Sequence, residues 1–114
     1  MFEKLTALFG KGSKELQTKR RIAAKLHDTP FKYISEKDET GVDTILARGG
    51  HLNLIGENKK ELCATVGTNT VFRLSVDEMS IWEFMSLDGC VITFVDLDTG
   101  KERTVTVYYE AHLS

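Results

Sequence analysis

The segment CVITFVDLDTGKERTVTVYY, residues 90–109, decides the fold class that we predict. Both of its arms, Cys90 to Leu97 and Thr104 to Tyr109, alternate side chains with the period of a β-strand that has a buried side. Between them lies Asp98-Thr99-Gly100. Its Asp and Thr suit the right-handed positions of a type I turn, and its glycine can adopt the left-handed conformation that completes a bulged hairpin. We therefore predict a β-hairpin over these residues.

The stretch before this hairpin, residues 76–86, fits two structures. As a helix it begins with a capping box at Ser75 to Glu78 and carries apolar residues at helical spacing. As a strand it places Trp82 and Phe84 on one face. We favour one helical turn at Val76–Met79 followed by a strand from Ser80 to Met85, because the run is short for a helix.

Seven short strands follow one another from Thr44 onward, with centres about 8–13 residues apart and turn residues between them. Their predicted centres are Ile45, Leu54, Ala64, Phe72, Trp82, Thr93 and Thr106. A turn at Gly49-Gly50 is expected to separate the first two strands. This spacing predicts a mainly β (α+β) fold, an antiparallel barrel or sandwich.

Period-two register also predicts which side chains share the core. The expected core residues are Phe72, Leu74, Trp82, Phe84, Ile92, Phe94, Val105 and Val107. Arg73, Glu83 and Arg103 are expected to face solvent.

Two helices are predicted before the strands, giving a single domain with three segments: a basic helical N-terminal extension at 1–28, a linker at 29–43 and the β domain at 44–114. The first helix, Met1 to Phe9, has one apolar face. The second runs from Lys14 to about His27 and is stopped by Asp28-Thr29-Pro30. Within the linker, Phe31 to Ile34 is a candidate short strand.

The pattern VDEMSIWEF at Val76 to Phe84, followed by the Asp88-Gly89 turn and the hairpin closed by Thr99-Gly100-Lys101, resembles the second half of small bacterial pleckstrin-homology-like (PH-like) β-barrels. The resemblance covers residues 44–110. It implies a bacterial protein with a seven-stranded barrel that acts in binding or scaffolding. Such barrels usually end in a helix that plugs an open corner; here the helix from Lys14 to Leu26 would have to take that place.

Charge is distributed unevenly, with +4 over residues 1–28 and −6 over residues 29–114, within a net charge of −2. The first helix could insert among lipid tails or pack on protein, and its nine residues favour protein because so short a helix is marginal alone. The second helix could contact nucleic-acid phosphates or present a solvated basic face. An acidic chain with no recognised nucleic-acid motif favours the solvated face.

No catalytic, cofactor or metal signature stands out. The two cysteines, Cys63 and Cys90, lie among apolar residues and are interpreted as buried core thiols. His27, His51 and His112 are far apart in sequence and lack further ligands at metal-binding spacing. We therefore predict no cofactor, no metal and no enzyme; an enzyme whose site residues are scattered in sequence is the weaker alternative.

Hydrophobic residues make up 41% and charged residues 28% of the 114 residues, which is ordinary for a folded domain. No apolar run reaches the roughly 20 residues of a membrane helix, and no secretory signal is recognised, so we expect a cytoplasmic protein.

The sequence thus predicts a non-enzymatic binding or assembly module that self-associates through its N-terminal helix or binds a protein partner. The alternative is a peripheral protein on an anionic membrane surface; nucleic acid is disfavoured. The candidate partner-binding residues are Phe2, Leu5, Leu8, Phe9, Lys19, Arg20, Arg21 and Lys25.

Overall fold

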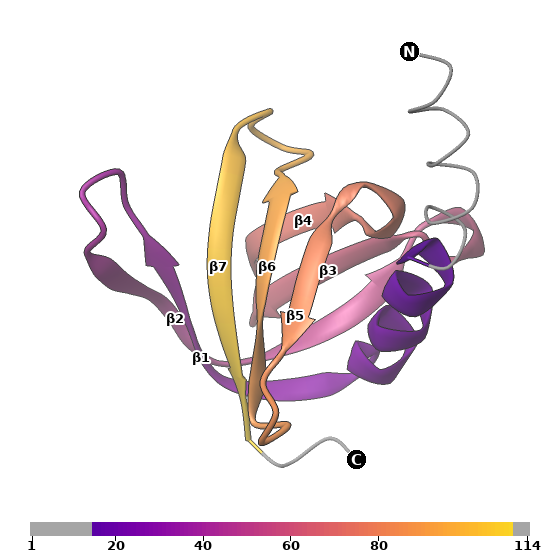
Figure 1. The fold of residues 1–114 in the computed structure, drawn as a ribbon, viewed down its shortest axis with the longest axis horizontal. Coiled ribbons are helices and arrows are strands. Elements are labelled where there is room, and N and C mark those ends of the chain that lie inside the picture. Colours follow the sequence, from indigo (N-terminus) through magenta and orange to yellow (C-terminus); the bar gives the residue numbers. More distant parts are fainter. Residues whose placement is uncertain (1–14, 111–114) are drawn as a thin grey trace.

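The computed structural model describes residues 15–110, which form one α-helix and seven strands (Figure 1). The helix spans residues 15–26. The strands are β1 (Thr29–Lys37), β2 (Asp43–Ile55), β3 (Glu61–Val66), β4 (Asn69–Ser75), β5 (Ser80–Glu83), β6 (Gly89–Val95) and β7 (Glu102–Tyr109). Two short 3₁₀ turns, η1 (Glu57–Lys59) and η2 (Val76–Glu78), link strands that are consecutive in sequence. The expected mainly β architecture of seven antiparallel strands is confirmed.

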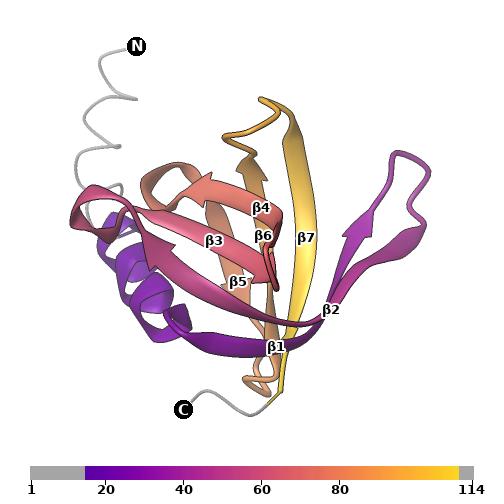
Figure 2. The ribbon, with the colours of Figure 1, turned by 180° about the vertical axis from the view of Figure 1, so that it is seen from behind.

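All seven strands belong to one antiparallel sheet in the order β4-β3-β2-β1-β7-β6-β5. The sheet consists of two meanders, β1 to β4 and β5 to β7, which are joined where β1 pairs with β7. The prediction of a closed barrel is wrong, because the edge strands β4 and β5 do not pair. The helix covers this side instead, held by ion pairs from Arg20 to Asp77 and from Lys25 to Glu83 (Figures 1 and 2).

The β6–β7 hairpin has the predicted facing. Cys90 lies opposite Val107 and Ile92 opposite Val105, and all four side chains are buried. Gly100 closes the loop with a φ of 72°, and its N–H donates to the Asp96 carbonyl at 2.8 Å. The favoured structure of residues 76–86, one helical turn and then a strand, matches η2 followed by β5.

The core prediction holds at six positions and fails at two. Those confirmed as buried are Phe72, Leu74, Ile92, Phe94, Val105 and Val107. Trp82 is 62% exposed, because β5 pairs Ile81 with the inward-facing Ile92 and thereby turns Trp82 outward. Phe84 also lies outside the core cluster, with its ring 5.7 Å from that of Tyr108.

The prediction for Arg103 is wrong in the opposite sense, because this side chain is more buried than expected. It was expected in solvent, yet its side chain is only 17% exposed and lies opposite the buried Phe94, on the inner face of the sheet. Glu83 and Arg73 are likewise half-buried, each in an ion pair. These residues were expected in solvent because they are charged, whereas ion-pair partners on other elements offset the cost of their burial.

The segment 29–43, assigned to a linker, contains the central strand β1. Only residues 38–42 form a loop. The expected turn at Gly49-Gly50 is also wrong, because β2 runs through both glycines. Gly50 is needed there for another reason: a Cβ would collide with the Thr65 carbonyl oxygen and the Phe31 ring.

The helix over 15–26 is the second of the two predicted helices. Ile22, Ala23 and Leu26 join the core, so the described helix of the predicted N-terminal extension packs against the strands. After the helix, Asp28 adopts a left-handed conformation and the Thr29 hydroxyl donates to the Lys25 carbonyl at 3.0 Å. The first predicted helix, Met1 to Phe9, lies outside the described residues.

Candidate functional site

The described candidate residues lie along the helix, where two of the four are neutralised by partners. The Arg20 guanidinium binds both carboxylate oxygens of Asp77 at 3.0 Å, and Lys25 lies 3.1 Å from Glu83. Arg21 is exposed and Lys19 is half-buried. The other candidates, Phe2, Leu5, Leu8 and Phe9, lie outside the described residues. Part of the predicted basic surface therefore fastens the helix to the sheet.

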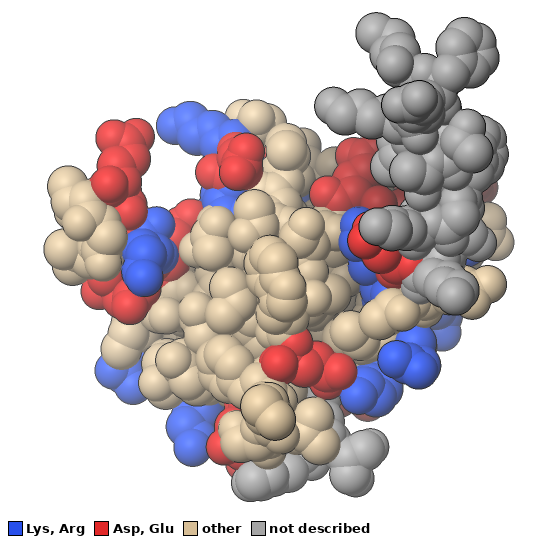
Figure 3. Space-filling model, viewed as in Figure 1, with Lys and Arg blue, Asp and Glu red and all other residues tan. Residues whose placement is uncertain are grey.

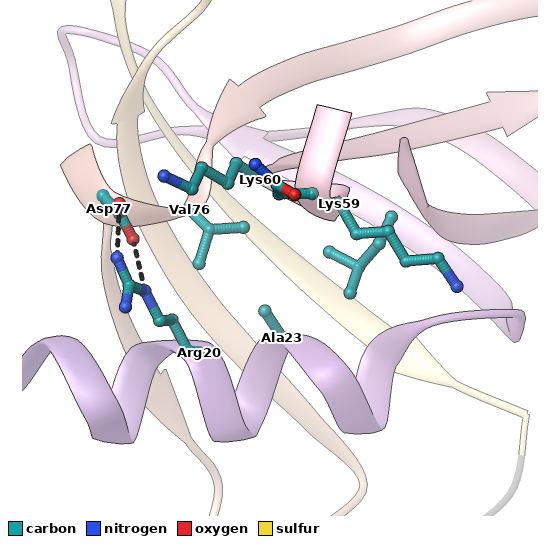
Figure 4. A pocket seen from close by; sticks show the side chains of 8 residues that line it. Arg20, Ala23, Lys59, Lys60, Val76 and Asp77 are labelled. Atoms are coloured by element: carbon teal, nitrogen blue, oxygen red, sulfur yellow. Dashed lines mark hydrogen bonds and ion pairs between the residues drawn. The ribbon is translucent and has the colours of Figure 1, made fainter. Parts of the chain in front are cut away.

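A pocket of ≈ 290 Å³ lies between this helix and the turn η1 (Figure 4). Its floor is apolar, and cations stand around it: Arg20 from the helix, and Lys59 and Lys60 from the η1 region. Lys60 extends toward Asp77, while Lys59 points away from it (Figure 4). The fold thus brings together cations that are about forty positions apart in sequence.

Asp77 is the negative centre of this basic cluster. The hydrogen bonds from Arg20 lower the pKa of the Asp77 carboxyl, and the positive charges of Arg20, Lys60 and Lys19 lower it further. The same bonds raise the pKa of Arg20. Asp77 therefore stays ionised and cancels one of the surrounding positive charges, leaving the cluster with an excess of basic groups.

A second surface is a hairpin arm, residues 37–46, which projects from the body of the domain (Figures 1 and 2). Its loop is ordered by the Asp38 carboxylate, which accepts the N–H groups of Thr40 and Val42 at 2.9 and 3.0 Å. The first half of β2 leaves Ile45 44% and Leu46 38% exposed, beside the 58% exposed Val42. Because these three large apolar side chains lie within five residues, we treat them as one contact surface and not as singly exposed residues.

An ion network fixes the root of this arm. Arg103 of β7 binds Glu36 of β1 at 2.9 Å and Asp96 at 2.7 Å. A further N–H of Arg103 donates to the Val71 carbonyl at 3.2 Å, which reaches β4. The hydrogen bonds that Arg103 donates to Glu36 and Asp96 raise the pKa of Arg103, so the guanidinium remains charged. One largely buried cation of β7 thus binds residues of β1 and β4 at the root of the arm.

A groove of ≈ 400 Å³ runs beside the arm. On one side it is lined by Leu46, Ala47 and Arg48 of β2, and on the other by the β3–β4 hairpin, including Val66 and Val71. Along this groove β2 has no second partner within residues 15–110, because β3 pairs with it only from His51 onward. We call the backbone of residues 43–49 on this side the open edge.

The outer face of the sheet carries aromatic rings in contact. Tyr33 stacks on Tyr108 at a centroid distance of 4.4 Å, and Arg48 lies 5.8 Å from the Tyr33 ring centroid. Trp82 and the fully exposed Met85 lie at the β5 edge, where Trp82 lines a shallow groove with the helix. These side chains extend the exposed apolar surface beyond the arm.

Both cysteines are free and buried, as expected. Burial raises the pKa of the Cys90 thiol to about 12, so it stays protonated at neutral pH and is a poor nucleophile. Within residues 15–110, no group of three or more His, Cys, Asp or Glu side chains is placed to hold a metal ion. In that same part of the chain, every helix is too short or too polar to cross a bilayer.

Comparison of the sequence with protein-family models, with curated proteins and with solved structures finds no match in any of the three. The resemblance to PH-like barrels therefore stays a prediction.

The arm and its groove were missed at the level of sequence. The one available indication was the run from Val42 to Ala47, whose apolar residues do not alternate cleanly with polar ones. A strand buried on one face should alternate, so this irregularity marks a segment with both faces outside the core.

Proposed function

We propose that the protein is a non-enzymatic assembly module that self-associates through apolar side chains left outside its core. One observation carries the proposal: large apolar residues are exposed in groups on the arm and at the β5 edge, with Trp82 at 62% and Val42 at 58% exposure. Grouped exposed apolar residues on a small domain mark surfaces that other protein covers. PH-like kinship, bacterial origin and cytoplasmic location stay predictions from the sequence.

Sedimentation equilibrium of the full chain over a wide concentration range tests this proposal. We expect a concentration-dependent increase in mass. A variant without residues 1–12 measures how much of the association uses Phe2, Leu5, Leu8 and Phe9, the N-terminal contact predicted from the sequence. If the full chain sediments as a monomer at every concentration, self-association is wrong.

A second candidate function is attachment to an anionic membrane surface. The observation that favours it is a basic cluster at the pocket: Lys19, Arg20 and Lys60 lie near the Asp77 carboxylate, and Lys59 lines the same pocket. Lysines near an anionic surface each contribute about 1 kcal/mol of attraction, which salt screens.

Co-sedimentation with vesicles tests the membrane function. We expect binding to anionic vesicles that weakens with salt, no binding to neutral vesicles, and a loss in the double variant Lys59→Ala/Lys60→Ala. The matched control, Lys32→Ala/Lys37→Ala, removes the same charge from exposed positions on β1. Equal loss in both double variants would show that total charge matters and the cluster does not.

A further inference from the structure

We propose that the open edge of β2 pairs with the same edge of a second copy, so that two sheets join into one through their arms. This inference rests on the proposed self-association and names its surface and geometry. It begins from the pairing of β2. Its residues 43–45, 47, 48 and 50 pair with β1 alone, residues 51 and 52 pair with both β1 and β3, and residues 53–55 pair with β3.

An unpaired strand edge is a template for another strand, because its outward N–H and C=O groups have no partner in the sheet. Proteins usually block such edges with lysine, proline, a β-bulge or a covering loop. The open edge has one such feature, a register shift at Leu46. The centre of the open edge, Thr44-Ile45-Leu46-Ala47, contains neither lysine nor proline. Within residues 15–110 no other strand pairs with this edge. The arm groove lies directly along it.

The chemistry of the groove matches that of the arm itself. Leu46 and Val71 give the groove apolar sides, and Arg48 adds a positive charge at its inner end. The arm offers apolar side chains at Val42 and Ile45 and negative charges toward its tip. Those acidic residues are Asp38, Glu39 and Asp43, and Figure 3 shows acidic side chains gathered over this part of the molecule.

An antiparallel arrangement brings these complementary ends together twice. When two copies of β2 run in opposite directions, the Asp43 end of one lies beside the Arg48 end of the other. Asp43 pairs with Lys37 and Arg48 with Tyr33 across β1, which places both on the outer face of the sheet. The contact is therefore self-complementary, as a two-fold dimer requires. A parallel arrangement would bring like charges together.

Sedimentation equilibrium of the full chain with one lysine introduced tests the surface. Ile45→Lys puts a charge on the open edge, and we expect the dimer dissociation constant to rise at least tenfold. The matched control is Ile55→Lys on the same strand, where the starting side chain is 37% exposed but the backbone is already paired with β3. The control should dimerise like the unaltered protein. Circular dichroism verifies that both variants are folded.

Charge reversal tests the antiparallel geometry. Asp43→Arg and Arg48→Asp should each weaken the dimer, and the double variant should restore it because the opposite charges face each other again. A double variant at least as weak as the weaker single variant would overturn the antiparallel arrangement.

The outcomes separate this inference from the proposed function. If Ile45→Lys dimerises like the control while removal of residues 1–12 gives a monomer, self-association stands and the arm inference fails. If the unaltered chain is a monomer at every concentration, both fail.

Discussion

Replacing Phe94 by alanine is the sharpest test of the facing of the sheet. Phe94 is 2% exposed, its ring lies 5.0 Å from that of Phe72, and the Arg103 guanidinium lies 5.9 Å from its centroid. Loss of a buried phenylalanine typically costs about 3–5 kcal/mol, and loss of an aromatic pair adds about 0.5–1.5 kcal/mol. We expect a loss of about 4 kcal/mol, against a total stability of about 5–15 kcal/mol for such a domain.

The matched comparison is Trp82→Ala, which also removes an aromatic ring but from a side chain that is 62% exposed. Surface substitutions usually change stability by about 0.5 kcal/mol, and the part of the ring in contact with the helix groove brings the expected loss to about 1 kcal/mol. Urea denaturation followed by circular dichroism measures both free energies of unfolding. At about 4 °C per kcal/mol, Phe94→Ala should melt about 16 °C below the unaltered protein.

Equal losses for the two variants would refute the assignment of faces, because Trp82 would then belong to the core. Phe94→Leu keeps this test usable if the alanine variant does not fold. It retains most of the side-chain volume and should cost about 1.5 kcal/mol, still more than Trp82→Ala.

Three other predictions follow from polar and backbone contacts. Arg103→Met leaves two acidic partners, Glu36 and Asp96, without their cation and should lower the free energy of unfolding in urea by about 3 kcal/mol. Arg73→Met removes more exposed ion pairs and should lower it by about 1 kcal/mol or less. Asp77 has a folded pKa lowered by the arginine that it binds, so its contribution to stability is present above the unfolded pKa of about 3.9 and is lost as pH falls through the folded pKa. The melting temperature of Asp77→Asn should accordingly lie below that of the unaltered protein at pH 7 and converge with it below about pH 4; a constant difference would show that ionisation is irrelevant. Gly50→Ala forces a Cβ into the Thr65 carbonyl and should cost about 3 kcal/mol of stability. In Gly100→Ala the new Cβ meets no atom within 4 Å, so this variant bears only the strain of its positive φ, about 1 kcal/mol. If thermal unfolding ranks Gly100→Ala as the less stable variant, the close approach at Gly50 is contradicted.

Local chemistry was enough to predict the elements whose structure is set by neighbours in sequence. The β6–β7 hairpin follows from the alternation of side chains in its two arms and from Gly100. The helical turn η2 followed by a strand follows from the length of the run 76–86, which is short for a helix. The helix buries Ile22 and Leu26, which are four residues apart and therefore share one helical face. In each case the deciding contact lies within a few residues or one turn of the chain.

Errors arose where a distant strand decides the outcome. Period two placed Trp82 and Ile81 on opposite faces correctly, but only pairing with β6 decides which of them is inside. The polar end of β1 was assigned to a linker because Glu36 has no visible reason to enter a sheet until Arg103 binds it. The arm groove could not be predicted from the sequence. It exists because β3 stops pairing with β2, and no local sequence pattern determines where that pairing ends.

The pairing of β1 with β7 affects how the protein folds while it is being synthesised. The strand β7 is synthesised after every other strand, yet it occupies an interior position in the sheet, where Phe31 pairs with Tyr109. A nascent chain that has released the first meander from the ribosome therefore exposes an edge of β1 until Tyr109 has also emerged. Closing so long a loop is slow, and an exposed strand edge in that interval can capture other chains. The rate of translation through residues 76–109 thus sets how long this protein is vulnerable to aggregation during its biosynthesis.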